Sequence, residues 1–110
     1  MPLYMSQIAY TPESWAAQVK NPQNRMDTVA PAACEAAGGK CIGAWLCFGK
    51  YDAVLIADMP NMESMAGVAL AFAAGGALKA CKTTPLMTGA QGIEALKKAQ
   101  TVGASYRPAR

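Results

Sequence analysis

The segment from Lys40 to Met59 constrains the fold most, because it holds two apolar runs separated by a short turn. The first run, residues 40–49, alternates side chains in the way that a strand does, and the second, residues 53–59, is apolar almost throughout. The turn between them, Gly49–Asp52, begins with a glycine, which tolerates the tight reversal of a hairpin. The segment therefore predicts two adjacent antiparallel strands.

Helix and strand patterns flank this hairpin on both sides. Before it, Thr11 followed by Pro12 is typical of a helix start, since the threonine hydroxyl can accept a backbone hydrogen bond and proline suits the first helical position. After it, Asn61 can cap an amphipathic helix in the same way. The expected elements are a strand at 3–10, helical pieces at 11–20 and 24–37, strands at 40–49 and 53–59, a helix at 61–74, a strand at 78–87 and a helix at 88–98.

This order predicts an α+β, ferredoxin-like β-α-β-β-α-β domain with a four-stranded antiparallel sheet, a short C-terminal helix and helices on one face only. We expect a single domain over residues 1–100 and a polar C-terminal tail over residues 101–110. Because 53% of the residues are hydrophobic, one copy carries more apolar surface than it can bury. The simplest way to bury the face of the sheet that no helix covers is to form a homodimer or higher homo-oligomer.

Charge and composition argue against several function classes. The net charge is +3 with only 15% charged residues, and the lysines and arginines are scattered, so nucleic acid is not an expected partner. No apolar run approaches the roughly twenty residues of a membrane span, and no secretion signal is apparent, so we expect a cytoplasmic protein. There is no histidine, and the cysteines do not form CxxC pairs, so we expect no metal and no cofactor.

Asp52 and Tyr51, in the predicted turn, are the candidates for catalysis. A carboxylate beside an apolar cavity can have a raised pKa and serve as an acid or base. The alternative is that Asp52 accepts hydrogen bonds from the backbone of its own turn. Tyr10, at the end of the first strand, is a candidate for hydrogen bonding to a ligand at a cavity mouth, and the alternative is that it caps the core.

Trp45, Cys47 and Lys82 are further candidates for ligand binding. Strict strand alternation puts Trp45 and Cys47 on one face together with Cys41, where Trp45 could form a flat wall for a ligand and Cys47 could act as a nucleophile. Lys82, on the face opposite to Cys81, could bind an anionic group. The alternatives are core or interface packing for Trp45 and Cys47, and for Lys82 a side chain that reaches solvent at the sheet edge.

The hairpin segment Phe48-Gly49-Lys50-Tyr51-Asp52-Ala53-Val54 resembles the motif of the GYD domain family, in which Gly, Tyr and Asp follow one another directly or with one residue after the Gly. The resemblance runs in order over roughly residues 2–100. It includes these further pieces: Tyr10-Thr11-Pro12, Asn21-Pro22-Gln23-Asn24-Arg25, Gly38-Gly39-Lys40, Met59-Pro60, Gly75-Gly76, Lys82-Thr83-Thr84-Pro85-Leu86 and, beyond that stretch, Tyr106-Arg107-Pro108.

The resemblance implies a ferredoxin-like fold similar to dimeric α/β-barrel proteins, in which two sheets face each other across a cavity. The family is largely uncharacterised, and such barrels include cofactor-free oxygenases, isomerases, lyases, haem-handling proteins and simple binders. The fold therefore does not select an activity.

We predict a homo-oligomer that binds a small apolar or aromatic molecule in a cavity against the sheet. One alternative is a cofactor-independent enzyme of isomerase, lyase or monooxygenase type acting on a small organic acid. Another is a structural subunit of a larger assembly. An enzyme requires a cavity in which at least two polar side chains converge on one point, whereas a structural subunit predicts no cavity and a very large interface.

Overall fold

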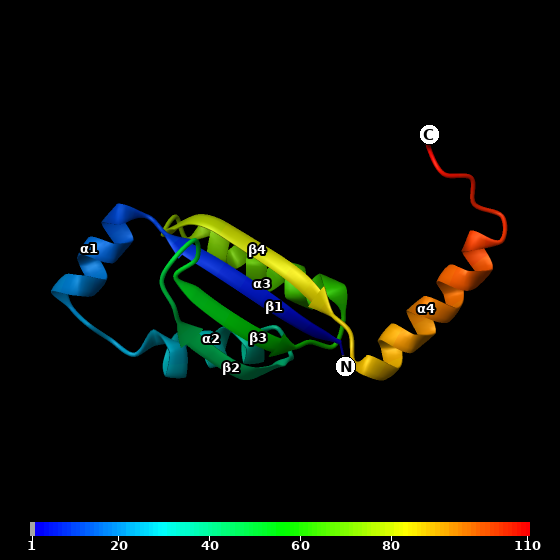
Figure 1. Ribbon diagram of the computed structural model, residues 1–110. Helices are drawn as coiled ribbons and strands as arrows, with labels where there is room; N and C mark the ends of the chain where they lie inside the picture. Colours follow the sequence, from blue (N-terminus) through cyan, green and yellow to red (C-terminus); the bar gives the residue numbers. More distant parts are fainter. Residues whose placement is uncertain (1) are drawn as a thin grey trace.

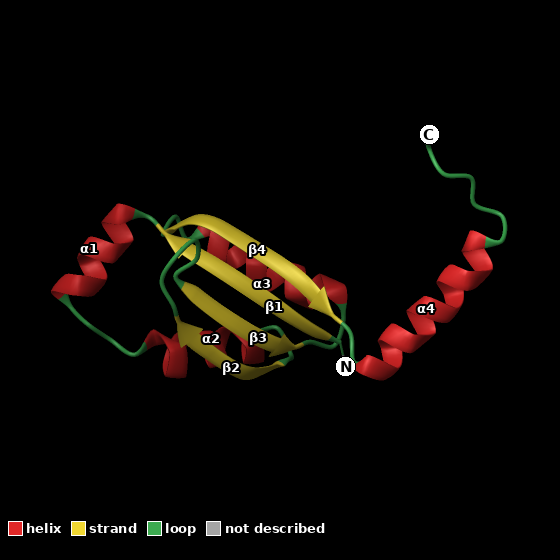
Figure 2. Ribbon diagram, viewed as in Figure 1, coloured by secondary structure: helices red, strands yellow, loops and turns green. Residues whose placement is uncertain are grey.

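Four strands and four helices follow one another in the computed structural model, which describes residues 2–110 (Figures 1 and 2). The elements are β1 Leu3–Tyr10, α1 Pro12–Lys20, α2 Arg25–Ala36, β2 Lys40–Leu46, β3 Ala53–Asp58, α3 Met62–Ala74, β4 Leu78–Leu86 and α4 Gly89–Gly103. This order confirms the predicted α+β fold, with the first helical region divided into two helices.

The helices begin where polar caps satisfy their free backbone N–H groups. Thr11 Oγ1 accepts from the N–H of Ser14 at 3.1 Å at the start of α1, and Asn61 Oδ1 accepts from the N–H of Ser64 at 2.8 Å at the start of α3. At the end of α2, Gly38 takes φ +84°, a conformation that costs a residue with a side chain about 1–2 kcal/mol. The two N-caps confirm the helix starts that the sequence predicted at Thr11 and Asn61.

The strands form one antiparallel sheet in the order β2-β3-β1-β4, which is the ferredoxin-like arrangement. Helices α2 and α3 lie behind the sheet in Figure 1 and cover that face. The core beneath them includes Cys34 from α2, Leu55 and Ala57 from β3, and Met65 and Val68 from α3. No helix of residues 2–110 covers the opposite face (Figure 2), which we call the helix-free face.

A bulge in β2 corrects the predicted faces of that strand. Cys41 and Gly43 pair with consecutive residues of β3, so Ile42 is an extra residue in β2. The bulge reverses the alternation, and Cys41 and Trp45 therefore do not share a face. Cys41 packs against the core under the helices, whereas Trp45 lies on the helix-free face with 56% of its surface exposed.

The two terminal helices project from the sheet. Neither α1 nor α4 has a buried residue, and α4 continues to Gly103, beyond the predicted end at Lys98 and into the predicted tail. The radius of gyration is 17.3 Å, compared with about 13 Å for a compact domain of this length, because both helices extend the molecule (Figure 1). Within residues 2–110 no helix combines the length and the apolar character that crossing a bilayer requires.

Candidate functional site

A cavity of about 240 Å³ lies between the sheet and the helices α2 and α3. Small side chains on both sides leave this space open, since an alanine cannot reach across the gap between a sheet and a helix. The alanines that line it are Ala30, Ala44, Ala53, Ala71 and Ala77. Larger apolar side chains close the remaining walls: Ile8, Met26, Leu55, Phe72 and Leu78. The cavity is therefore suited to an apolar molecule.

Among the lining residues, only Tyr10 and Arg25 carry a hydroxyl or a charge. Tyr10 comes from the end of β1, is 6% exposed, and meets the ring of Trp15 edge-to-face with the ring centroids 5.1 Å apart. Arg25 is the first residue of α2 and is exposed to solvent. One buried phenol and one exposed guanidinium are thus the polar side chains available to a ligand in this cavity.

Asp52 holds this end of the sheet together without lining the cavity. Its Oδ2 accepts from the backbone N–H of Tyr10 at 2.9 Å and from the indole Nε1–H of Trp15 at 3.3 Å. Its own backbone N–H donates to the carbonyl of Ile8 at 2.7 Å. The carboxylate therefore connects the β2–β3 turn to β1 and α1, and fixes the two aromatic rings that stand beside the cavity.

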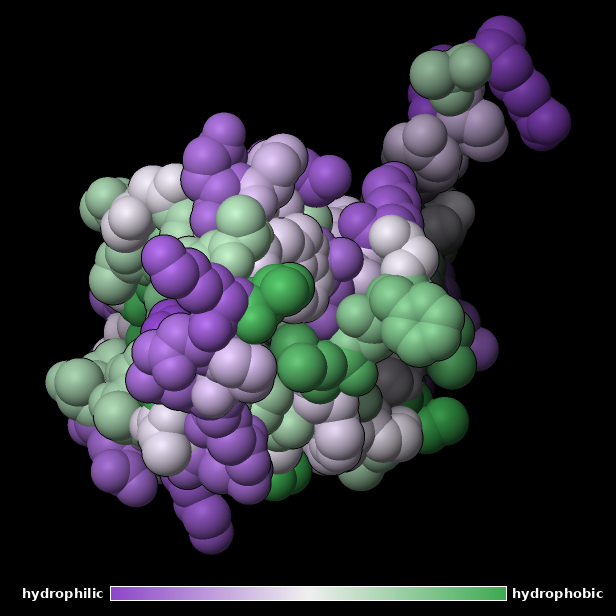
Figure 3. Space-filling view, turned by 90° about the vertical axis from the view of Figure 1, so that its left-hand side faces the viewer, coloured by the Kyte–Doolittle hydropathy of each residue, from purple (hydrophilic) through white to green (hydrophobic). Residues whose placement is uncertain are grey.

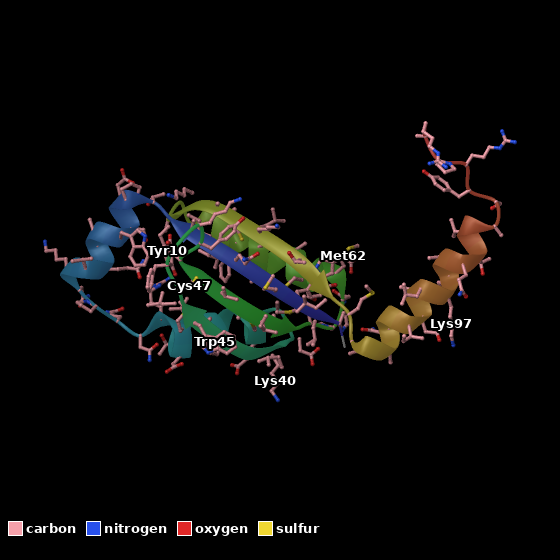
Figure 4. All side chains as sticks on the ribbon, in the orientation of Figure 1. Tyr10, Lys40, Trp45, Cys47, Met62 and Lys97 are labelled. Carbon is pink, nitrogen blue, oxygen red and sulfur yellow. The ribbon has the colours of Figure 1, made fainter. Side chains whose placement is uncertain are left out.

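The other candidate residues lie outside the cavity. The thiol of Cys47 donates to the carbonyl of Tyr51 at 3.3 Å, and the ring of Tyr51 lies below the ammonium of Lys50, which is 5.9 Å from its centroid. Figure 4 shows Tyr10 and Cys47 at the same end of the sheet and Trp45 on β2. Lys82 pairs with Gln7 and points to the helix-free face. The structure thus groups Tyr10, Asp52, Tyr51 and Cys47 at one end of the sheet, and it places Trp45 and Lys82 on the helix-free face.

All four cysteines are free thiols: Cys34 is buried, and Cys41, Cys47 and Cys81 are partly buried. Burial raises the pKa of the Cys34 thiol to about 11, with the nearby Cys41 as a further cause, so Cys34 stays protonated at neutral pH. Cys81 lies 3.8 Å from the hydroxyl of Ser6 on the helix side of the sheet. In the part of the chain that the structure describes, no three Cys, Asp or Glu side chains gather in a way that could hold a metal ion.

Arg25 is the residue of this site that the sequence analysis missed. It follows Asn24, whose side chain accepts from the N–H of Asp27 at 3.2 Å, and in the sequence it is only the first residue of a helix. Nothing local marks it as part of a cavity, because the opposing walls come from β1, β3 and α3. The alanines of β2, β3 and α3 are the feature of the sequence that could have indicated the cavity.

A protein-family model described as the GYD domain matches residues 4–96, most of the chain. The match confirms the resemblance that the hairpin motif and the flanking pieces indicated. Neither the curated proteins nor the solved structures contain a match to this chain.

Replacing Asp52 tests its role as the connection between turn, strand and helix. Asp52→Ala leaves the N–H groups of Tyr10 and Trp15 without their acceptor, and we expect the free energy of unfolding to fall by about 2 kcal/mol. In a Trp45→Phe background, the emission of Trp15 should shift to longer wavelength as its ring is released. Asp52→Asn, whose amide oxygen can still accept, should be milder, and Glu13→Ala on α1 is the control. Unchanged stability and emission in Asp52→Ala would refute this role.

Proposed function

We propose that this chain, which belongs to the GYD domain family, binds a small apolar or aromatic molecule in the cavity between its sheet and helices α2 and α3. The observation that carries the proposal is the apolar lining of a 240 Å³ space that the core leaves open. An apolar cavity of roughly 150 Å³ accepts a benzene ring, so this one accommodates about ten non-hydrogen atoms. A two-ring aromatic body matches that size.

The lining favours binding over catalysis. Asp52, the predicted acid or base, accepts hydrogen bonds from Tyr10 and Trp15 and does not line the cavity, and neither does Tyr51. An enzyme needs two or more polar groups around one reacting atom, whereas here the buried phenol of Tyr10 and the exposed Arg25 stand among apolar side chains. A purely structural subunit, the other alternative, would have no use for an open cavity.

We also propose that two copies associate through their helix-free faces. Each strand of that face presents apolar side chains that no helix covers, including Met5 on β1, Ile56 on β3 and the exposed Trp45 on β2. The ring of Trp45 lies flat on the sheet, since a Cβ at Gly43 would come within 2.5 Å of its Cη2 atom. A second copy of the same face would bury these apolar side chains. Figure 3 shows the molecule from the α1 end, with hydrophobic surface between hydrophilic patches.

Filling the cavity tests the binding proposal. We expect the neutral probe 2-naphthamide to bind the wild-type protein in an isothermal titration, with one site per chain. Ala44→Leu adds three carbon atoms to the wall of the cavity, so the Kd should rise at least tenfold because the ring no longer fits. Ala95→Leu, the same change on exposed α4, should leave the Kd unchanged. No binding to the wild-type protein, or equal binding by Ala44→Leu, would overturn the proposal.

Charging the helix-free face tests the proposed dimer. Ile56→Glu places a carboxylate at the centre of the face, where a second copy would bury it, and we expect a monomer by size-exclusion chromatography with light scattering. Ile93→Glu, the matched change on α4, should leave the dimer intact. A monomeric wild-type protein would contradict the proposal, and so would a dimer that Ile93→Glu breaks and Ile56→Glu does not.

A further inference from the structure

We infer that the molecule held in this cavity carries a carboxylate at one end, and that Arg25 binds that carboxylate at the mouth while the apolar body fills the space under the sheet. The inference rests on the proposed function and adds the chemical class of the ligand. It assigns to Arg25 a role in ligand recognition. A compact aromatic monocarboxylic acid is the kind of molecule that meets both requirements.

Charge is the first support. Arg25 is the only charged residue that lines the cavity, and none of the other lining residues is acidic. Within residues 2–110 the one ion pair joins Lys97 and Glu94 on α4, so Arg25 has no carboxylate partner there. The nearest acid along the chain, Asp27, accepts instead from the side-chain amide of Asn24 at 2.7 Å. The guanidinium can therefore form a bidentate pair with an incoming carboxylate.

Position is the second support. Arg25 is exposed, whereas Tyr10 at the same cavity is 6% exposed, so the lining includes a charged residue that reaches solvent as well as buried residues. A wholly apolar ligand would form no ion pair or hydrogen bond with the Arg25 guanidinium. An amphipathic acid would bury its rings among Ile8, Phe72 and Leu78 and keep its carboxylate hydrated and paired at the mouth.

The two helices that line the cavity, α2 and α3, also bear on the orientation of the ligand. The first turn of α2, which begins at Arg25, presents the positive end of a helix dipole. The C-terminal end of α3 lies at the cavity through Ala71 and Gly75, and its last carbonyls, such as those of Ala71 and Phe72, already accept from Gly75 N–H. Asp27 in the first turn of α2 offsets that positive end, so the dipoles disfavour an anionic group at the α3 side and leave Arg25 as the positive charge at the α2 side.

A set of three probes that share one ring system tests the inference. Isothermal titration would compare 2-naphthoate, 2-naphthamide and 2-naphthylmethylammonium against the wild-type protein and against Arg25→Gln, Arg25→Lys and Lys20→Gln. We expect the wild-type protein to bind the carboxylate about tenfold more tightly than the amide, and the ammonium most weakly. Arg25→Gln should remove the preference for the carboxylate, so that the carboxylate and the amide bind with similar Kd values. Arg25→Lys should keep part of the preference.

The remaining outcomes separate this inference from the proposed function. Lys20→Gln, which removes an exposed cation of α1 outside the cavity, should behave as the wild-type protein. If the amide and the carboxylate bind equally well to the wild-type protein, or if Arg25→Gln keeps the preference, the inference is wrong and the cavity still binds apolar molecules. If none of the three probes binds, the proposed function itself fails. Because Arg25 is exposed, its replacement is not expected to unfold the chain.

Discussion

Small side chains between the sheet and its two helices are the constraint on which the site depends. The sheet packs against α2 and α3 at Met65 and Val68, where large residues meet, but toward Tyr10 alanines stand among the larger side chains. A backbone spacing set by the large residues leaves room where the residues are small. The same core therefore both closes one end of the domain and leaves a cavity of about 240 Å³ at the other.

Asp52 holds in place the part of the cavity wall that Tyr10 forms. Its carboxylate accepts from the backbone of Tyr10 and from the indole of Trp15, and these two side chains stack edge-to-face. The Asp of the family motif thus works here as a connection between elements that lie far apart in the sequence. This role accounts for a carboxylate at the end of the hairpin without assigning it any chemistry.

Much of the fold could be predicted because its determinants are local. The caps Thr11 and Asn61, the glycine at 38 and the hairpin turn each fix an element boundary through contacts within a few residues. The faces of β2 could not be predicted by alternation, since one extra residue at Ile42 reverses them. Gly43, a glycine inside a strand, was the available indication of a bulge.

The candidate site was less predictable, because its contacts join distant parts of the chain. Asp52 was found from the turn, but its partners Tyr10 and Trp15 are set by the tertiary fold. Trp45 and Lys82 lie on the helix-free face, so their part in ligand binding stays a prediction that depends on a second copy. The cavity lies under the sheet, where only a three-dimensional arrangement brings Arg25 to β1 and α3.

The location of a bound aromatic molecule tests the central claim most directly. In methyl NMR spectra of the protein titrated with 2-naphthamide, the account predicts shifts and ligand contacts at Ile8 and Leu78, which line the cavity, with Met5 and Ile56 on the helix-free face unaffected. Contacts confined to Met5 and Ile56 would place the ligand on the opposite side of the sheet and would contradict the account.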